Sequence, residues 1–211
     1  MAPSPAQPRG YSDNQPFPAG YSSTILKLFV ESLARGNDVQ ALDAGPVCQE
    51  NINFFAQRMR RHYACDMFIR LQRLPGEQPR PGNLVRHLDY PARSFDGIEL
   101  WDLIDHLDDD QARQLMARCS EMLKTTGVLM LIALEKKPEP ARINTFVVGR
   151  DYRVGFRLQP HLELAWHCRH NRALMSLLAE FEIVRSFRYV NGLREFLLKK
   201  PTLTRARIGD W

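Results

Sequence analysis

The feature that most constrains the fold of this chain is an almost purely aliphatic run, Val128–Leu134, near the middle of the sequence. A strand whose successive side chains are all apolar is covered on both faces, as strands of parallel sheets are. An earlier run, Gly97–Leu103, is short, apolar and bounded by polar residues, and it predicts a second strand. Between the two runs, apolar residues recur at helical spacing: Ala112, Leu115, Met116, Cys119, Met122 and Leu123. Two buried strands joined by a covering helix form a βαβ unit, which predicts an α/β protein with a largely parallel sheet.

Polar residues mark both ends of the helix between these strands. Asp108, Asp109 and Asp110 stand where a helix N-terminus favours a capping oxygen and negative charge. The pair Thr126-Gly127 predicts the end of the helix, because glycine commonly follows the last helical turn.

The remaining chain continues the alternation of strands and helices. Its patterns predict helices over 24–35, 50–61 and 171–181, strands over 39–43, 62–66 and 84–88, and a hairpin of 183–190 with 195–199 around Asn191-Gly192. Such alternation is typical of a doubly wound, mostly parallel sheet of about seven strands with helices on both faces.

Length and composition indicate one domain. A chain of 211 residues suits a single core. We expect residues 1–20, rich in Pro, Gly, Ser and Ala, to form a disordered arm, residues 21–200 to form the domain, and residues 201–211 to form a tail. The longest aliphatic run is far shorter than the roughly 20 residues that span a bilayer, so no membrane partner is expected. Four scattered cysteines without an export signal predict reduced thiols in a cytoplasmic protein.

The net charge of +5 comes from basic residues concentrated late in the chain. A solvated basic face is the favoured interpretation, because no nucleic-acid-binding motif accompanies the charge. The alternative is a surface for an anionic partner such as nucleic acid or an acidic carrier. The residues concerned are Arg142, Arg150, Arg153, Arg157, Arg169, Arg172, Arg185, Arg188, Arg194, Lys199, Lys200, Arg205 and Arg207.

Residues 95–107 read F-D-x-I-x-L-W-D-x-I-D-H-L, and residues 123–131 read L-K-x-x-G-V-L-x-L. This order resembles the second half of the class I S-adenosylmethionine (SAM)-dependent methyltransferase core. That family's sheet also ends in a β hairpin, so the resemblance runs from about residue 38 to 200. It implies a Rossmann-like methyltransferase fold, SAM as cofactor and methyl transfer to a small-molecule or unidentified acceptor.

The resemblance also implies which residues hold the cofactor. The turn Asp43-Ala44-Gly45-Pro46-Val47-Cys48-Gln49 corresponds to the family's glycine-rich loop, where a missing Cβ lets the backbone approach the cofactor. Gly45 keeps the first glycine, whereas Val47 and Gln49 replace the other two.

Five positions after the other strands complete this implied site. Asp66 resembles the acid that binds the ribose hydroxyls. Asp89 resembles the acid that receives the adenine amino group, and Tyr90 would flank the adenine ring. Leu100 and Trp101 end the strand that passes the methionine portion of the cofactor.

Catalysis in such enzymes can be mostly positioning, because the sulfonium is already activated. Asp102 and His106 are the candidate catalytic residues. We expect residues 136–170 to form an insertion, of which 143–168, rich in aromatic residues and arginines, covers the cleft mouth opposite Gly45 and Trp101.

Two hypotheses compete for the function. One is an active methyltransferase, and the other is a catalytically inactive methyltransferase-like interaction module with a basic surface. Side chains of Val47 and Gln49 filling the cavity between Gly45, Asp66, Asp89 and Leu100 would favour the module. No metal site is expected, since His161, His167, Cys168 and His170 fit no standard zinc spacing. A nucleophile elbow, a nicotinamide fingerprint and a P-loop are absent from the sequence.

Overall fold

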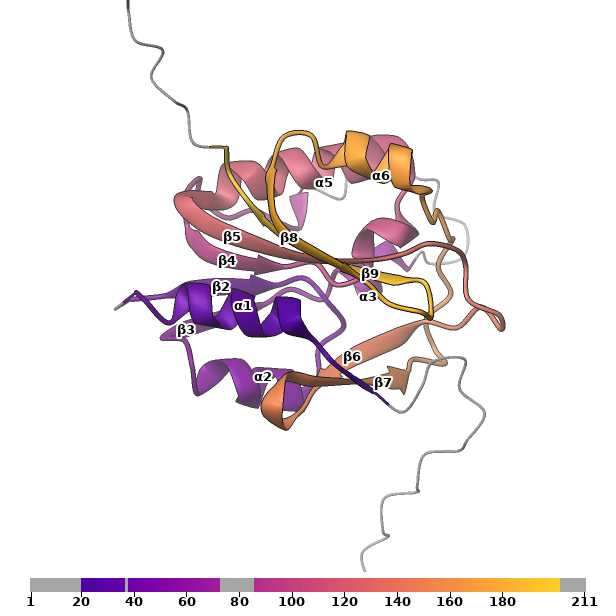
Figure 1. Cartoon of the computed structure of the whole chain (residues 1–211), viewed down its shortest axis with the longest axis horizontal. Coiled ribbons are helices and arrows are strands. Elements are labelled where there is room, and N and C mark those ends of the chain that lie inside the picture. Colours follow the sequence, from indigo (N-terminus) through magenta and orange to yellow (C-terminus); the bar gives the residue numbers. More distant parts are fainter. Residues whose placement is uncertain (1–19, 37, 73–85, 202–211) are drawn as a thin grey trace, which may run out of the picture.

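The computed structural model describes residues 20–36, 38–72 and 86–201, and a six-stranded sheet forms the centre of this part (Figure 1). The strands lie in the order β3-β2-β4-β5-β9-β8. The first four are mutually parallel, while β9 is antiparallel to β5 and to β8. Their bounds are β2 Gln40–Asp43, β3 Arg61–Ala64, β4 Phe95–Glu99, β5 Leu123–Leu134, β8 Glu182–Arg188 and β9 Leu193–Lys199.

This sheet confirms the α/β class and corrects the expected seven strands. In the described residues it has six strands, and three short strands form a second sheet in the order β1-β7-β6. Residues 84 and 85 of the strand expected over 84–88 lie outside the described residues, and residues 86–88 are not in a strand. The second sheet consists of β1 Tyr21–Ser22, β6 Asn144–Val148 and β7 Arg153–Leu158.

Helices cover both faces of the large sheet. Figure 1 shows α1 and α2 on one side and α5 and α6 on the other. The core is correspondingly divided, with α3, α5 and α6 packed on one face and α1, α2, β6 and β7 on the other. The helices are α1 Thr24–Leu33, α2 Gln49–Ala56, α3 Met67–Leu71, α5 Asp109–Met122 and α6 Asn171–Leu177, with 3-10 turns at Leu103–His106 and Arg150–Tyr152.

The βαβ unit predicted from the sequence is present as β4, α5 and β5. Asp108 caps α5 through a hydrogen bond from the backbone N–H of Gln111, whose side chain in turn accepts from the Asp108 N–H. Successive residues of β5 from Leu129 to Ala133 alternate between the two halves of the core, which confirms a strand buried on both faces.

The predicted helix end at Thr126-Gly127 is wrong. Helix α5 ends at Met122, and β5 begins at the next residue because Leu123 already pairs with Phe95 of β4. The register then shifts before Gly97, so Gly127 lies inside the strand at this irregularity. A Cβ there would lie 2.9 Å from Cδ2 of Leu123 and 3.1 Å from the Phe95 carbonyl oxygen, so a larger residue would force these neighbours to shift.

The two sheets are joined by polar contacts with α2. The Asn51 side chain of α2 donates to the carbonyl of Phe146 (2.9 Å) and accepts from the N–H of Val148 (2.8 Å). Glu50 and Arg157 form an ion pair between α2 and β7. These contacts hold β6 against the same face of the large sheet that α2 covers.

The carboxyl-terminal hairpin forms as predicted, with Gly192 at its turn in the left-handed region (φ 82°). Glu195 of β9 is buried and accepts from the hydroxyls of Tyr21 (2.6 Å), Ser23 (2.9 Å) and Tyr189 (2.8 Å). The start of the described chain is thereby tied to its last strand.

No described helix is long and apolar enough to cross a membrane. The expected arm over residues 1–20, apart from Gly20, and the expected tail over 201–211, apart from Pro201, lie outside the described residues.

Candidate functional site

The order of the strands places the candidate site at the carboxyl ends of β2 and β4. From β2 the chain proceeds to β3 on one side, whereas β4 lies on the other side. Such a change of direction opens a crevice beyond the strand ends, where α/β proteins bind ligands. Asp43 is the last residue of β2, and Glu99 is the last residue of β4.

Trp101 fills the space above Gly45. A Cβ on Gly45 would lie 2.3 Å from Cδ1 and 2.8 Å from Nε1 of the indole, so the ring rests directly on the glycine. The indole Nε1 donates to Oδ1 of Asp43 (2.7 Å), and the same oxygen accepts from the Gly45 N–H (2.8 Å). Three predicted cofactor residues therefore contact one another, and the indole lies on the glycine that the cofactor was expected to approach.

The position of Trp101 depends on the small sheet. Its ring stacks on Phe146 of β6, with centroids 5.6 Å apart and planes 15° apart. Its backbone has a φ of 48°, in the left-handed region that residues with a Cβ adopt rarely. Leu100 beside it is fully buried in the opposite half of the core.

Val47 and Gln49 do not fill the crevice. Val47 is 49% exposed, and exposed Gln49 donates to Asn53 of the same helix (2.8 Å). Pro46 is buried between Gly45 and Val47. The side chain that closes the crevice is therefore Trp101, and not the two residues that depart from the glycine-rich pattern.

Asp66 is the N-cap of α3. Its Oδ1 accepts from the N–H of Ile69 (3.0 Å), and its Oδ2 accepts from the N–H of Val47 (3.1 Å). The carboxylate thus links the loop after β2 to the end of β3. Each of its oxygens has a second lone pair for a further donor.

A cavity of about 370 Å³ opens beside this carboxylate. It brings together Asp66 and Tyr90, but neither Gly45, Asp89 nor Leu100 lines it. Tyr90 packs edge-on against Tyr63 and Phe95, and Asp89 is exposed. The cavity lining consists of Ala64, Cys65, Asp66, Ile69, Arg70, His87 and Tyr90.

Asp102 and His106 are buried together after β4. Nε2 of His106 lies 3.8 Å from Oδ2 of Asp102, and Nδ1 lies 3.0 Å from the Ala165 carbonyl, to which it donates. Burial lowers the pKa of His106, but Asp102 and the Ala165 carbonyl outweigh it and raise that pKa overall. Trp166 covers the imidazole at a centroid distance of 4.3 Å, and neither residue of the pair lines the cavity beside Asp66.

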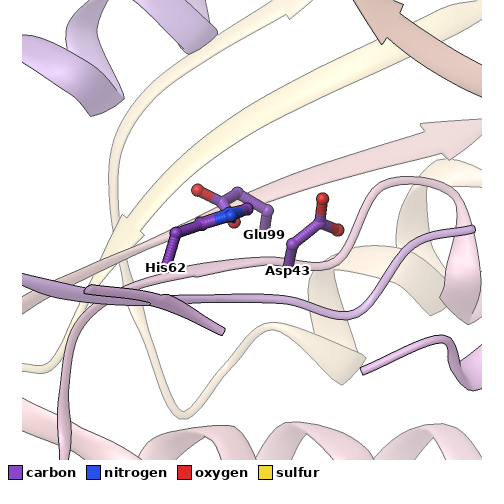
Figure 2. Close-up of side chains that lie close together, drawn as sticks. All are labelled: Asp43, His62 and Glu99. Atoms are coloured by element: carbon purple, nitrogen blue, oxygen red, sulfur yellow. The ribbon is translucent and has the colours of Figure 1, made fainter. Parts of the chain in front are cut away.

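A second group of buried ionisable residues lies beneath the crevice and was not predicted. Figure 2 shows Asp43, His62 and Glu99 with their side chains close together. Nε2 of His62 is 3.5 Å from Oε2 of Glu99. Burial, followed by the neighbouring Glu99, raises the pKa of Asp43 to about 7, and burial raises the pKa of Glu99 well above its usual value. Burial lowers the pKa of His62. The sequence signal was Glu99 itself, an ionisable residue inside an apolar strand.

Many of the late basic residues are engaged within the molecule. Arg169 and Arg194 are buried and donate to backbone carbonyls, including those of Ile104 and Leu134. Arg157, Arg188 and Lys199 form ion pairs, and Lys200 donates to the Leu123 carbonyl. Of these residues, the buried Arg169 and Arg194 do not contribute to a basic surface. Arg205 and Arg207 lie outside the described residues.

The histidines late in the chain do not form a metal-ligating group. In the described part of the chain, the group that brings three such side chains together is Asp43, His62 and Glu99. His161, His167 and His170 are exposed, and Cys168 is half-buried.

Comparisons with known proteins identify the fold of this chain. No protein-family model matches the chain, and no curated protein matches its sequence. A SAM-dependent methyltransferase from Methanosarcina mazei matches with a TM-score of 0.51 and 14% identity, over 84% of this chain and 97% of that chain. The 1,6-didemethyltoxoflavin-N1-methyltransferase of Burkholderia thailandensis, solved with S-adenosylhomocysteine, matches with a TM-score of 0.48 and 17% identity, over 85% and 79%. The first likeness shows that the chain has the fold of SAM-dependent methyltransferases, which confirms the resemblance at the level of fold.

Proposed function

We propose that this protein is a SAM-dependent methyltransferase that transfers a methyl group to a small-molecule acceptor. The observation that carries the proposal is the cavity at the carboxyl end of β3, lined by Asp66 and Tyr90. In a methyltransferase fold this is the expected position of an adenosine group, and a cavity of about 370 Å³ lies in the range of ligand pockets.

The residues present fit the adenosine half of SAM. Asp66 offers free lone pairs to the ribose hydroxyls, and Tyr90 offers an aromatic face to the adenine. Exposed Asp89, next to Tyr90, is the proposed acceptor for the adenine amino group. SAM supplies an activated methyl group on a sulfonium, so the protein's part is to orient donor and acceptor.

The methionine half would lie along Asp43, Gly45, Pro46 and Leu100. Trp101 covers Gly45, so we propose that this indole moves away when the cofactor binds, and that its hydrogen bond to Asp43 breaks. The segment 143–168, through the stack of Phe146 on Trp101, is the proposed cover of the crevice. Asp102 and His106 are proposed to hold or move a proton once this cover opens.

Calorimetric titration of the full chain with SAM tests the proposal. We expect binding in the micromolar range and a matched rise in the melting temperature. Asp66→Asn keeps an oxygen that can cap α3 but loses the charge. It should weaken SAM at least tenfold, since a hydrogen bond to a charged group contributes about 1.5–3 kcal/mol.

Asp108→Asn is the matched control. Asp108 is also a capping aspartate, at the start of α5 and outside the cavity, so this change should leave SAM affinity unaltered. Absence of heat and of thermal stabilisation at millimolar SAM would overturn the proposal. It would leave the catalytically inactive interaction module as the better account, with Trp101 permanently seated on Gly45.

A further inference from the structure

Three ionisable side chains meet on one face of the large sheet. Asp43 pairs with Glu99 across β2 and β4, and His62 of β3 pairs with Ala41, which is on the same face as Asp43. Neighbouring strands of a sheet present paired residues on the same side. The three side chains therefore gather beneath α1 and α2, from three adjacent strands (Figure 2).

These side chains are deeply buried and incompletely paired. The side chains of His62 and Glu99 are 3% and 0% exposed, and Asp43 is 4% exposed. Nε2 of His62 and both carboxylate oxygens of Glu99 have no hydrogen-bond partner. Buried polar groups without partners are rare because each costs free energy.

The same protein shows how a buried glutamate is otherwise accommodated. Glu195 is 1% exposed and accepts hydrogen bonds from three hydroxyl groups. Glu99 has an equally buried position but receives none, and it faces an imidazole nitrogen instead. The unpaired Nε2 of His62 and the unpaired Oε2 of Glu99 therefore lie only 3.5 Å apart.

We propose that Asp43, His62 and Glu99 bind one divalent transition-metal ion, with Zn²⁺ as the representative. One donor atom from each side chain lies within 4.8 Å of the other two, which suits a common metal ligand set. An imidazole nitrogen with two carboxylate oxygens matches the ligand types of such ions better than those of Mg²⁺ or Ca²⁺.

The surroundings hold two of the three ligands in place. Oδ1 of Asp43 accepts from Gly45 and Trp101, which fixes the orientation of the carboxylate. The His62 ring stacks on Phe55 of α2, with centroids 4.7 Å apart and planes 25° apart. Fixed outer contacts of this kind orient metal ligands in proteins. The ion would thus lie just below the residues that close the crevice, as a structural centre.

The test uses the full chain, stripped with a chelator and titrated with Zn²⁺ in the absence of SAM, so it does not depend on the proposed cofactor. We expect one equivalent to bind and the melting temperature to rise. Glu99→Gln, which has nearly the same shape, should weaken Zn²⁺ at least tenfold. His167→Gln, in the exposed histidine cluster, should leave the affinity unchanged.

Two measurements on the unaltered chain cover the case in which Glu99→Gln fails to fold. Co²⁺ should give visible absorption bands that excess Zn²⁺ removes and excess Mg²⁺ does not. Crystals soaked in Zn²⁺ should show an anomalous peak between the three side chains. A peak elsewhere, no binding by the unaltered chain, or equal affinity in folded Glu99→Gln would overturn the proposal.

Discussion

Gly45 and Trp101 determine whether the crevice is open. Because Gly45 has no Cβ, the indole of Trp101 can lie directly against its backbone. The ring is held there by a hydrogen bond to Asp43 and by stacking on Phe146. The glycine of a ligand-binding turn is thus part of the packing of a tryptophan in this structure. Any bound molecule at this point competes with that packing.

Gly45→Ala tests this fit. The new methyl group would lie 2.3 Å from the indole, so Trp101 must shift, and we expect a loss of about 1–3 kcal/mol of unfolding free energy. Gly149→Ala is the control, because its Cβ would meet only the Arg153 carbonyl at 3.5 Å. Urea unfolding measures both. In a Trp101→Leu background the cost of Gly45→Ala should largely disappear, and an unchanged cost there would contradict the packing argument.

The buried carboxyl group of Asp105 should make the unfolding free energy depend on pH. Its carboxyl is fully buried, and burial raises its pKa to about 8, against the lowering effect of the Leu134 N–H bond (2.6 Å). The folded state therefore holds a proton that the unfolded chain releases near pH 4, and this stabilisation is lost as pH rises towards 8. Asp102, His106 and Arg194 are the neighbouring charged groups.

Comparison of unfolding at pH 5 and pH 8 checks this effect. By linkage, the contribution of Asp105 should fall by on the order of 3 kcal/mol between these values. Asp105→Asn removes the titration, so the variant should lose less stability than the unaltered chain over the same interval. Equal losses in both proteins would show that other groups dominate.

Residue patterns gave the positions of several site candidates but not their contacts. Asp66 and Tyr90 do line one cavity, as the resemblance implied, although the strand expected before Tyr90 is not found at residues 86–88. The position of the Trp101 ring was not predictable, because it depends on stacking with Phe146, which lies 45 residues later and in the small sheet. Glu99 could have been noticed, since a carboxyl group in a strand buried on both faces needs a partner.

At the scale of elements, α5 shows how local sequence determines a helix start. Its capping box supplies acceptors to two backbone N–H groups that the helix leaves unpaired. Asp108→Ala should therefore reduce the unfolding free energy by about 1 kcal/mol. Asp108→Asn should retain most of it, and chemical denaturation of the two variants distinguishes a capping effect from a general effect of charge.

The other end of α5 was not predictable from local signals. The sequence predicts that the helix extends through Lys124, Thr125 and Thr126 and ends at Gly127, because glycine commonly follows the last helical turn. Pairing of Leu123 with Phe95 starts the strand earlier, and this pairing depends on the neighbouring strand and not on the helix. Tertiary pairing outweighs a weak local preference here.

At the scale of the whole molecule, Glu195 connects the beginning and the end of the fold. Tyr21→Phe removes one hydrogen bond to this buried carboxyl group and should cost about 1–3 kcal/mol. Tyr63→Phe, whose hydroxyl donates to neutral Gln40 at 3.2 Å, should cost less. Urea unfolding compares the two variants, and a smaller cost for Tyr21→Phe would refute the role of Glu195.

The overall architecture was largely predictable because strands and helices alternate along the sequence. The apolar strands and amphipathic helices predicted a doubly wound sheet, and the Asn-Gly turn predicted the hairpin. The small sheet β1-β7-β6 was not predictable as a unit, since β1 has two residues and pairs with a strand more than a hundred positions later.

The link from Tyr21 to Glu195 has a consequence for synthesis on the ribosome. The two residues are 174 positions apart in the sequence. Strand β5, inside the sheet, cannot pair on one of its sides until β9 has been synthesised. While the chain is being translated, α1 has neither its Glu195 anchor nor its complete sheet. The nascent polypeptide thus leaves the part of the apolar face of α1 that packs on β9 exposed until almost the whole domain has emerged, a period in which chaperones can bind it.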